Sequence, residues 1–460
     1  MRPLEVLLVT LVILSATSVL TGKASRRLLA WLAVLSLAAL LAHSLVEGPH
    51  WQMIPAYLAV LLFPAALVFR RPVVNGIVAT AMLLLVAGAC AASAVLPMFH
   101  LPAPTGPYAI GTRILHLVND HPSDPSSADV RGKRELMIQV WYPAGSSHER
   151  RAPYRKLAET TLKSSYQAVL WTHSRWNAPF AQNGSPFPIL LLNPAWNGRR
   201  TYYTYLVEDL VSHGYVVVGI DHTGNSGPTL FPDGHVDQPA AAPGLDFVTH
   251  TFEQLNAFAA RQIEIQVEDN RFVLDQLEIW NNDPASVFHG RIDMERVGAL
   301  GHSFGGAVAA QACLEDSRIK SALDMDGSFW GPVQKTGLTR PVMMIEEDQA
   351  QLTPQQLQQD HGALMDHLLD LGDMEMMHKS NGYLITLHGS THSSFTDRSL
   401  FSPLKSQSGV GTVPAGREYA ILRRYVLAFF DKTLHGANSP LLRNNDQTFP
   451  EATVEVTHRP

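Results

Sequence analysis

The chain has 460 residues, of which 46% are apolar and 17% charged, where a soluble domain carries ~25% charged residues. This length allows two or three structural units, and the ample apolar surface excludes intrinsic disorder. Residues 1–100 carry six basic and two acidic side chains, whereas the remaining 360 residues carry 29 basic and 39 acidic ones. An acidic bulk without clustered Lys and Arg excludes nucleic acid as a partner. The two cysteines, Cys90 and Cys313, exclude a disulfide framework and a multi-cysteine zinc site.

The first hundred residues contain four apolar runs, Val6–Thr21, Leu28–Val46, Met53–Phe69 and Val73–Leu96. Each run is close to the ~20 residues that a helix needs to cross ~30 Å of hydrocarbon. The first run could alone be a signal peptide, but three more runs of the same kind follow at once. The pattern therefore predicts a transmembrane region over residues 1–97, with four helices at about 6–21, 28–46, 53–69 and 73–96.

The basic residues in the short loops predict the orientation of this region. Lys23, Arg26 and Arg27 lie between the first two runs, and Arg70 and Arg71 lie between the third and fourth. Under the positive-inside rule both loops face the cytoplasm, so the N-terminus and everything after the fourth run lie outside. The sequence thus predicts a multi-pass protein of the cytoplasmic (inner) membrane, with its larger part on the periplasmic or extracellular side.

After a proline-rich joint the pattern changes to short β runs that alternate with amphipathic stretches. We expect a joint and first strand over residues 98–134, followed by one domain over 135–460. Continuous apolar strands such as Val216–Ile220 suit a parallel sheet that is buried on both faces. The predicted strands are Tyr108–Leu117, Leu136–Tyr142, Pro188–Leu192, Tyr215–Asp221, Arg296–Gly301, Ile319–Asp326, Pro341–Glu346 and Tyr383–Leu387. The predicted helices are Thr201–His213, Glu253–Trp280, Phe304–Glu315, Pro354–Leu371 and Arg417–Leu434. Their alternation predicts an α/β fold, a mostly parallel sheet with helices on both faces.

The most informative stretch is Gly301-His302-Ser303-Phe304-Gly305-Gly306, which follows a predicted strand and begins a predicted helix. This is the context that the Gly-x-Ser-x-Gly nucleophile elbow requires, because the tight turn leaves no room for large neighbours of the serine. Ser303 would then stand at a helix N-terminus, where backbone N–H groups favour developing negative charge. His302, beside it, is expected to pack behind the elbow.

A serine nucleophile needs a base and an orienting acid, which in this fold follow in the order Ser, Asp or Glu, His. His392 follows the last predicted strand, and Asp326 ends the strand after the elbow. Two other acids compete with Asp326. Asp324 lies two residues earlier on the same strand, facing the same side but deeper. Asp348 follows the next strand, where many hydrolases of this kind carry their acid.

Residues Val140 to Phe395 resemble the platelet-activating-factor acetylhydrolases, which are α/β-hydrolases that cleave short or oxidised acyl chains from phospholipids. The matching stretches are Val140–Pro143, Ser212–Tyr215, Phe272–Leu277, Ile292–Arg296 with the elbow, and Gly389–His392 with Phe395. The resemblance implies Ser303 as nucleophile, His392 as base and Asp326 as acid. It also implies Trp196 and Phe304 as the two backbone N–H donors of the oxyanion hole.

One departure from the family lies in the oxyanion region. The family usually has His-Gly before the first donor, whereas this chain has Pro194-Ala195-Trp196. This form is closer to bacterial cutinase-like polyester hydrolases, which the chain resembles more weakly.

The sequence therefore predicts a membrane-anchored serine ester hydrolase acting on phospholipids or similar lipid or small-molecule esters, and it leaves the oligomeric state open. The alternatives are a general carboxylesterase or polyester hydrolase, and a catalytically vestigial signalling or scaffold protein. No cofactor and no metal are expected, since the spacings His361/His367 and His388/His392 fit no standard ligand pattern. The Pro- and Gly-rich segment Ser226–Thr251 is a candidate lid or pocket wall.

Overall fold

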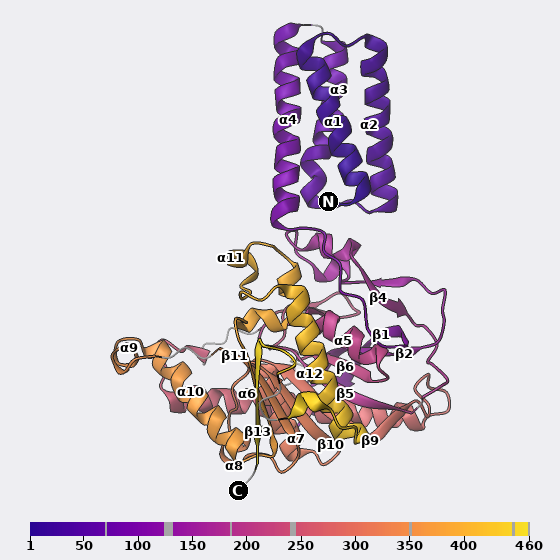
Figure 1. Cartoon of the computed structure of the whole chain (residues 1–460). Coiled ribbons are helices and arrows are strands. Elements are labelled where there is room, and N and C mark those ends of the chain that lie inside the picture. Colours follow the sequence, from indigo (N-terminus) through magenta and orange to yellow (C-terminus); the bar gives the residue numbers. More distant parts are fainter. Residues whose placement is uncertain are drawn as a thin grey trace. The chain divides into compact units, whose positions relative to one another are not determined.

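The computed structural model describes residues 1–69, 71–123, 132–184, 186–239, 245–348, 352–443 and 447–458, without the side chains of 406 and 407 (Figure 1). Arg70 of the predicted cytoplasmic loop, residues 124–131 of the joint and residues 240–244 of the candidate lid lie outside this part. The chain forms two compact units. The first, the bundle unit, comprises Met1–Leu101, Pro153–Trp171 and Arg398–Ser408, and the second, the sheet unit, comprises the rest of the chain.

Four long helices make up most of the bundle unit. They are α1 (Pro3–Thr21), α2 (Arg26–Val46), α3 (Ile54–Val68, after a 3₁₀ turn, η1, at Trp51–Met53) and α4 (Pro72–Val95). All four are long and apolar enough to cross a membrane, as predicted from the sequence. Small buried side chains such as Ala16, Ala59 and Ala89 let the helices approach closely. Large apolar side chains, including Leu41 and Leu84, remain exposed on the outside, as in a helix that faces lipid.

The bundle unit also contains two short segments from the part of the chain that the sequence assigns to the catalytic domain. The indole Nε1 of Trp51 donates to the carbonyl oxygen of Lys163 at 3.0 Å. Ser402 Oγ donates to the carbonyl oxygen of Val95 at 2.6 Å. The ring of Phe99 lies 5.3 Å, centroid to centroid, from that of Phe401. These contacts join both segments to the ends of the helices. The first segment includes two 3₁₀ turns, η3 (Leu157–Glu159) and η4 (Ser165–Val169), and the second includes α11 (Lys405–Ser408).

The sheet unit is built on a sheet with the strand order β13-β12-β11-β10-β9-β5-β6-β2-β1-β4-β3. Its centre is parallel, from β6 to β12, and β2, β1 and β13 introduce antiparallel pairs. The strands are β1 (Ala109–Asn119), β2 (Arg134–Ala144), β3 (Arg151–Pro153), β4 (Trp171–Trp176), β5 (Phe187–Asn193), β6 (Val216–Asp221), β9 (Ile292–His302), β10 (Ile319–Met325), β11 (Val342–Glu347), β12 (Gly382–Leu387) and β13 (Ala452–Thr457). All eight predicted strands are present. The sequence did not predict the edge strands β3 and β13, the strand β4 beside β3, or the separate hairpin of β7 (Thr229–Leu230) and β8 (Val236–Asp237).

Helices cover both faces of this sheet, as predicted for an α/β fold. Ile189 and Leu191 of β5 pack in one core with α6 (Phe252–Asn282) and α7 (Phe304–Glu315). α5 (Thr204–Ser212) packs against α12 (Ala415–His435), and α12 contacts β9 and β10. The remaining described helices are α8 (Pro332–Thr336), α9 (Pro354–Gln359), α10 (His361–His378) and the 3₁₀ turns η5 (Arg200–Tyr203), η7 (His392–Phe395), η8 (Asp397–Leu400) and η9 (Pro440–Leu442).

The single helix predicted over Pro354–Leu371 is wrong, because the structure has two helices there. Asp360 has extended backbone angles, and its side chain accepts the N–H of Ala363, so it ends α9 and caps the start of α10. The second helix also continues seven residues beyond the predicted end, to His378.

Candidate active site

Ser303 stands in a strained turn between β9 and α7. Its φ of 56° and ψ of −128° lie outside the regions that a non-glycine residue normally adopts. The turn is tight because a Cβ at Gly301 would lie 2.0 Å from the Gly305 carbonyl oxygen, and one at Gly305 would lie 2.1 Å from that of Asn193. The Ser303 N–H donates to the Met325 carbonyl oxygen at 2.9 Å, which fixes the turn against β10. The local geometry is that of a nucleophile elbow.

Asp326 follows β10 directly and is held in place by two strands. Its N–H donates to the Ile345 carbonyl oxygen at 2.7 Å, and its Oδ1 accepts the Glu347 N–H at 2.7 Å. Its Oδ2 lies 2.6 Å from Nδ1 of His392. The side chain of Asp326 is only 7% exposed, whereas that of His392 is half exposed. The bond to Nδ1 leaves Nε2 as the nitrogen that can take a proton from a serine.

The structure thus brings Asp326, and neither of the two competing acids, to His392. Asp348 instead contacts Nδ1 of His388 at 2.6 Å and accepts the Gly389 N–H at 2.7 Å. These two bonds, with the backbone N–H first, lower the pKa of Asp348. Asp324 is fully buried, and its burial together with the nearby charge of Asp326 raises its pKa well above the usual range. The structure records no contact between Asp324 and His392 among the described residues, whereas Asp326 contacts His392 directly.

A chain of hydrogen bonds through His302 and Tyr203 supports the loop of His392, and the sequence analysis assigned no role to Tyr203. His302 is buried as expected, and its Nε2 donates to the His392 carbonyl oxygen at 2.9 Å. Its Nδ1 lies 3.2 Å from the hydroxyl of Tyr203, which also accepts the Ala195 N–H at 3.1 Å. Tyr203 therefore connects the loop of the expected oxyanion donor Trp196 with the loop of His392. Only tertiary contacts bring these residues together, so no local sequence signal points to Tyr203.

A cavity of about 570 Å³, called here the Ser303 cavity, joins these groups. Ser303, Asp326 and His392 all line it, together with both expected oxyanion residues. Phe304 begins α7, so its N–H has no acceptor within the helix. The Trp196 ring meets that of Phe304 edge-on at 5.1 Å. The structure therefore places all five predicted site residues around one space.

Acidic and aromatic side chains form the rest of the wall. Described acidic residues in the lining include Glu347, Asp366, Asp370 and Asp373, and no Lys or Arg is among the described lining residues. Burial, followed by the charge of Asp366, raises the pKa of Asp370 to about 6. Burial also raises the pKa of Glu347, where the charge of Asp326 adds to the effect.

Trp330 and Phe247 add aromatic surface to the same wall. Leu245 and Phe247 come from the described part of the Ser226–Thr251 segment, which therefore contributes to the pocket wall.

Comparison with known proteins identifies the family. The model of "Platelet-activating factor acetylhydrolase, isoform II" matches residues 99–447. The chain belongs to this family. A probable 1-alkyl-2-acetylglycerophosphocholine esterase of Arthroderma benhamiae is 24% identical over 78% of this chain and 95% of its own length. A platelet-activating factor acetylhydrolase of Cavia porcellus is 21% identical over 78% of this chain and 84% of its own length.

A solved esterase structure has a fold similar to that of this chain. The ferulic acid esterase from Streptomyces cinnamoneus matches with a TM-score of 0.62 and 30% identity, over 77% of this chain and 99% of that one. This neighbour agrees with the weaker resemblance to cutinase-like hydrolases that the Pro194-Ala195-Trp196 stretch suggests. The acetylhydrolase resemblance and the α/β-hydrolase fold are confirmed, and the chain is a carboxylic ester hydrolase of a lipid-ester-cleaving family.

Proposed function

We propose that the chain is a membrane-anchored serine hydrolase that cleaves short acyl chains from phospholipids by way of an acyl-enzyme. The observation that carries this proposal is the 2.6 Å contact between His392 Nδ1 and Asp326 Oδ2 at the edge of the Ser303 cavity. The contact orients the imidazole so that Nε2 is available to the serine, which is the arrangement that a Ser-His-Asp mechanism needs.

The reaction follows from these positions. Ser303 Oγ attacks the acyl carbonyl carbon while its proton passes to His392 Nε2, and Asp326 stabilises the resulting imidazolium. The backbone N–H groups of Trp196 and Phe304 bind the oxyanion. The intermediate collapses by breaking the ester C–O bond, and His392 returns the proton to the departing alcohol oxygen. Water then attacks the acyl-enzyme with His392 as base, which releases the carboxylic acid and regenerates the serine.

The wall of the Ser303 cavity supports a substrate that carries a cationic group. Glu347, Asp366 and Asp370 supply negative charge, and Trp330 and Phe247 supply ring faces of the kind that bind quaternary ammonium groups. The relative from Arthroderma benhamiae is named for a substrate that ends in choline. We therefore favour acyl esters of glycerophosphocholine as substrates of this chain.

Replacing Ser303 by Ala tests the mechanism. Loss of the nucleophile should lower kcat by up to ~10⁶-fold, the scale found for other serine hydrolases. The purified full chain should also lose labelling by a fluorophosphonate, while its circular dichroism spectrum stays unchanged. Wild-type turnover by the variant, in a preparation free of host esterases, would exclude the proposed nucleophile.

A second candidate activity, general carboxylesterase or polyester hydrolysis, is favoured by the 30% identical esterase structure and by the Pro194-Ala195-Trp196 stretch. Comparing kcat/KM for a short-chain phosphatidylcholine and for p-nitrophenyl butyrate separates the two. We expect the phospholipid to be the better substrate, and the reverse preference would favour the general esterase.

The four apolar helices support a membrane anchor, and the basic residues between them support its orientation. Lys23 between α1 and α2, Arg26 and Arg27 at the start of α2, and Arg71 before α4 would face the cytoplasm. A fusion of alkaline phosphatase after Pro107 should therefore be active in a bacterial host. A fusion of green fluorescent protein at the same point, exported by the general secretory route, should be dark. The opposite pattern would put the sheet unit in the cytoplasm.

A further inference from the structure

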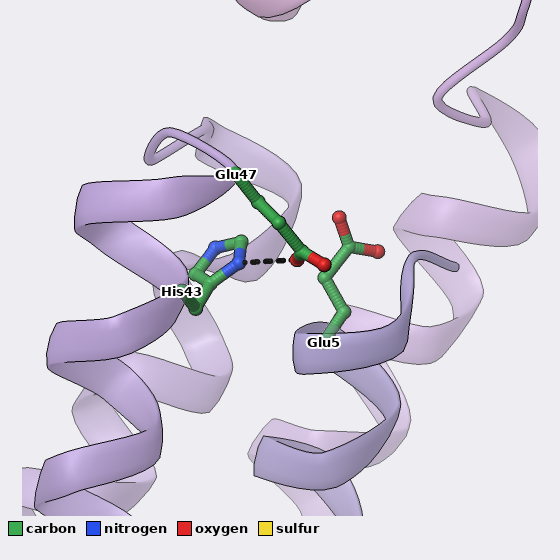
Figure 2. A group of neighbouring side chains, drawn as sticks. All are labelled: Glu5, His43 and Glu47. Carbon is green, nitrogen blue, oxygen red and sulfur yellow. Dashed lines mark hydrogen bonds and ion pairs between the residues drawn. The ribbon is translucent and has the colours of Figure 1, made fainter.

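A group of polar side chains lies buried at the end of the helix bundle that carries the N-terminus. Glu5 comes from the first turn of α1, His43 from the last turn of α2, and Glu47 follows that helix directly. Glu5 and His43 are completely buried in a bundle whose other buried residues are mostly apolar. Figure 2 shows these three side chains pointing toward one another from the ends of two helices. Such groups are costly inside an apolar bundle, and they usually mark a binding site or a proton path.

The three side chains are spaced like the ligands of a metal ion. Each offers one nitrogen or oxygen atom, and these atoms all lie within 4.8 Å of one another. His43 Nδ1 and Glu47 Oε2 are 2.9 Å apart. Two ligands held ~2.0–2.1 Å from a tetrahedral Zn²⁺ stand roughly 3.3 Å apart, so an ion would need only small side-chain shifts. The other ring nitrogen of His43 lies 2.6 Å from the Tyr57 hydroxyl, the kind of outer contact that fixes a ligating imidazole.

A fourth side chain, His50, is buried beside these three. The Gln52 amide nitrogen donates to the Leu96 carbonyl oxygen, so its Oε1 faces His50 Nδ1, 3.0 Å away. Nδ1 is therefore the donor. His50 Nε2 then faces Oε1 of Glu5 at 3.0 Å. His50 Nε2 therefore brings a second imidazole nitrogen next to Glu5, one of the three candidate ligands.

Arg2 brings a guanidinium group to these side chains. Its Nε donates to Glu5 Oε1 at 2.6 Å, but its two other guanidinium nitrogens donate to the carbonyl oxygens of Glu47 and Gly48. Those carbonyls belong to the C-terminal end of α2, which carries a partial negative charge of ~0.5. The backbone N–H of Arg2 also donates to Glu5 Oε2 at 2.9 Å, so two carboxylates and the end of α2 share this one residue.

We propose that this group binds one divalent transition-metal ion, with Glu5, His43 and Glu47 as ligands and His50 within reach as a fourth. Mixed imidazole and carboxylate ligands suit Zn²⁺, which we take as the ion to test. The ion would tie α1 to α2 and to the connection before α3, and it would have no part in ester hydrolysis.

The experiment uses the full chain in detergent micelles, stripped of metal by a chelator and then titrated with Zn²⁺. We expect one ion per chain by elemental mass spectrometry, a higher Tm with Zn²⁺, and Co²⁺ bands typical of four- or five-coordinate nitrogen and oxygen ligation. Glu47→Gln, which can still accept the Leu4 N–H, should weaken binding at least ~100-fold, above the 10–100-fold range for outer-shell changes. Ester hydrolysis by the same samples reports whether the sheet unit is folded.

The matched control is His116→Asn, because His116 and Glu135 form an exposed pair at 2.6 Å in the sheet unit. This variant should bind Zn²⁺ as the wild type does. If Glu47→Gln fails to fold, Tyr57→Phe, which removes only an outer contact, should weaken binding ~10–100-fold. The proposal is overturned if the wild type takes up no ion at micromolar Zn²⁺, or if all variants bind equally. It is also overturned if Zn²⁺ leaves the Tm of the metal-stripped wild type unchanged.

Discussion

Two aspartate–histidine pairs lie at the ends of the neighbouring strands β10 and β11, and only one has the features of a catalytic pair. In both pairs the Nδ1–Oδ distance is 2.6 Å. Asp326 is buried, and its partner His392 lines the Ser303 cavity. Asp348 and His388 are each about half exposed, and Nε2 of His388 is already engaged with Thr453 Oγ1 at 2.7 Å. A carboxylate beside an imidazole is therefore not enough, since the imidazole must also lie at the cavity that holds the nucleophile.

The largest effect that this comparison predicts comes from replacing each aspartate by Asn. Asp326→Asn should lower kcat by ~10⁴-fold, because an amide favours the wrong tautomer of His392. Asp348→Asn should change kcat by less than about threefold, since exposed pairs of this kind contribute little. Steady-state kinetics on a soluble ester measures both. A larger loss in Asp348→Asn would transfer the catalytic role to the second pair.

A smaller effect is expected from the hydrogen bonds through Tyr203 and His302, which support only the Asp326–His392 pair. Tyr203→Phe removes the hydroxyl that joins Ala195 to His302, and so loosens both the oxyanion loop and the loop of His392. We expect kcat to fall ~10-fold, which corresponds to ~1.4 kcal/mol, with KM nearly unchanged. The matched control is Tyr215→Phe, because that buried hydroxyl bonds Asp431 at 2.7 Å, away from the cavity. Both variants should lose stability, and an equal loss of kcat in the two would show that Tyr203 is merely structural.

Much of the first pair could be predicted from the sequence, because local features encode it. The glycines around Ser303 reflect a turn that needs them, and Asp326 ends one predicted strand while His392 follows another. The hydrogen bonds from Tyr203 to His302 and from His302 to the His392 backbone could not be predicted, since they join residues 99 and 90 positions apart. The break at Asp360 was also missed, because the helical pattern continues through it while the Asp360 side chain caps the second helix.

The polar group of the bundle was missed for a different reason. Glu5 and Glu47 enter the sequence analysis only as charges that set the net charge of the first hundred residues. An acid within or next to an apolar run is itself a signal, since burying it requires a partner. Which partner it finds depends on helix packing, and this is why His43 and His50 could be recognised only in the folded bundle.

The smallest predicted effect concerns Asp370, a cavity carboxyl that belongs to neither pair. Its folded-state pKa of about 6 lies above its ordinary value, so the folded protein holds the proton more tightly than the unfolded chain does. The stabilising effect of this proton is complete at pH 4 or below and is lost as the pH rises through about 6. Asp370→Asn should therefore leave Tm unchanged at pH 4 and raise it at pH 8. Because Asp370 is partly exposed, the gain should be at most about 1 kcal/mol, or roughly 2 °C.

Glu375→Gln on the same helix is the control. Its pKa is lowered by the Lys379 side chain, so this variant should lose a little stability at pH 8. Calorimetry of both variants at the two pH values measures the difference, and equal shifts would mean that the Asp370 proton has no special environment.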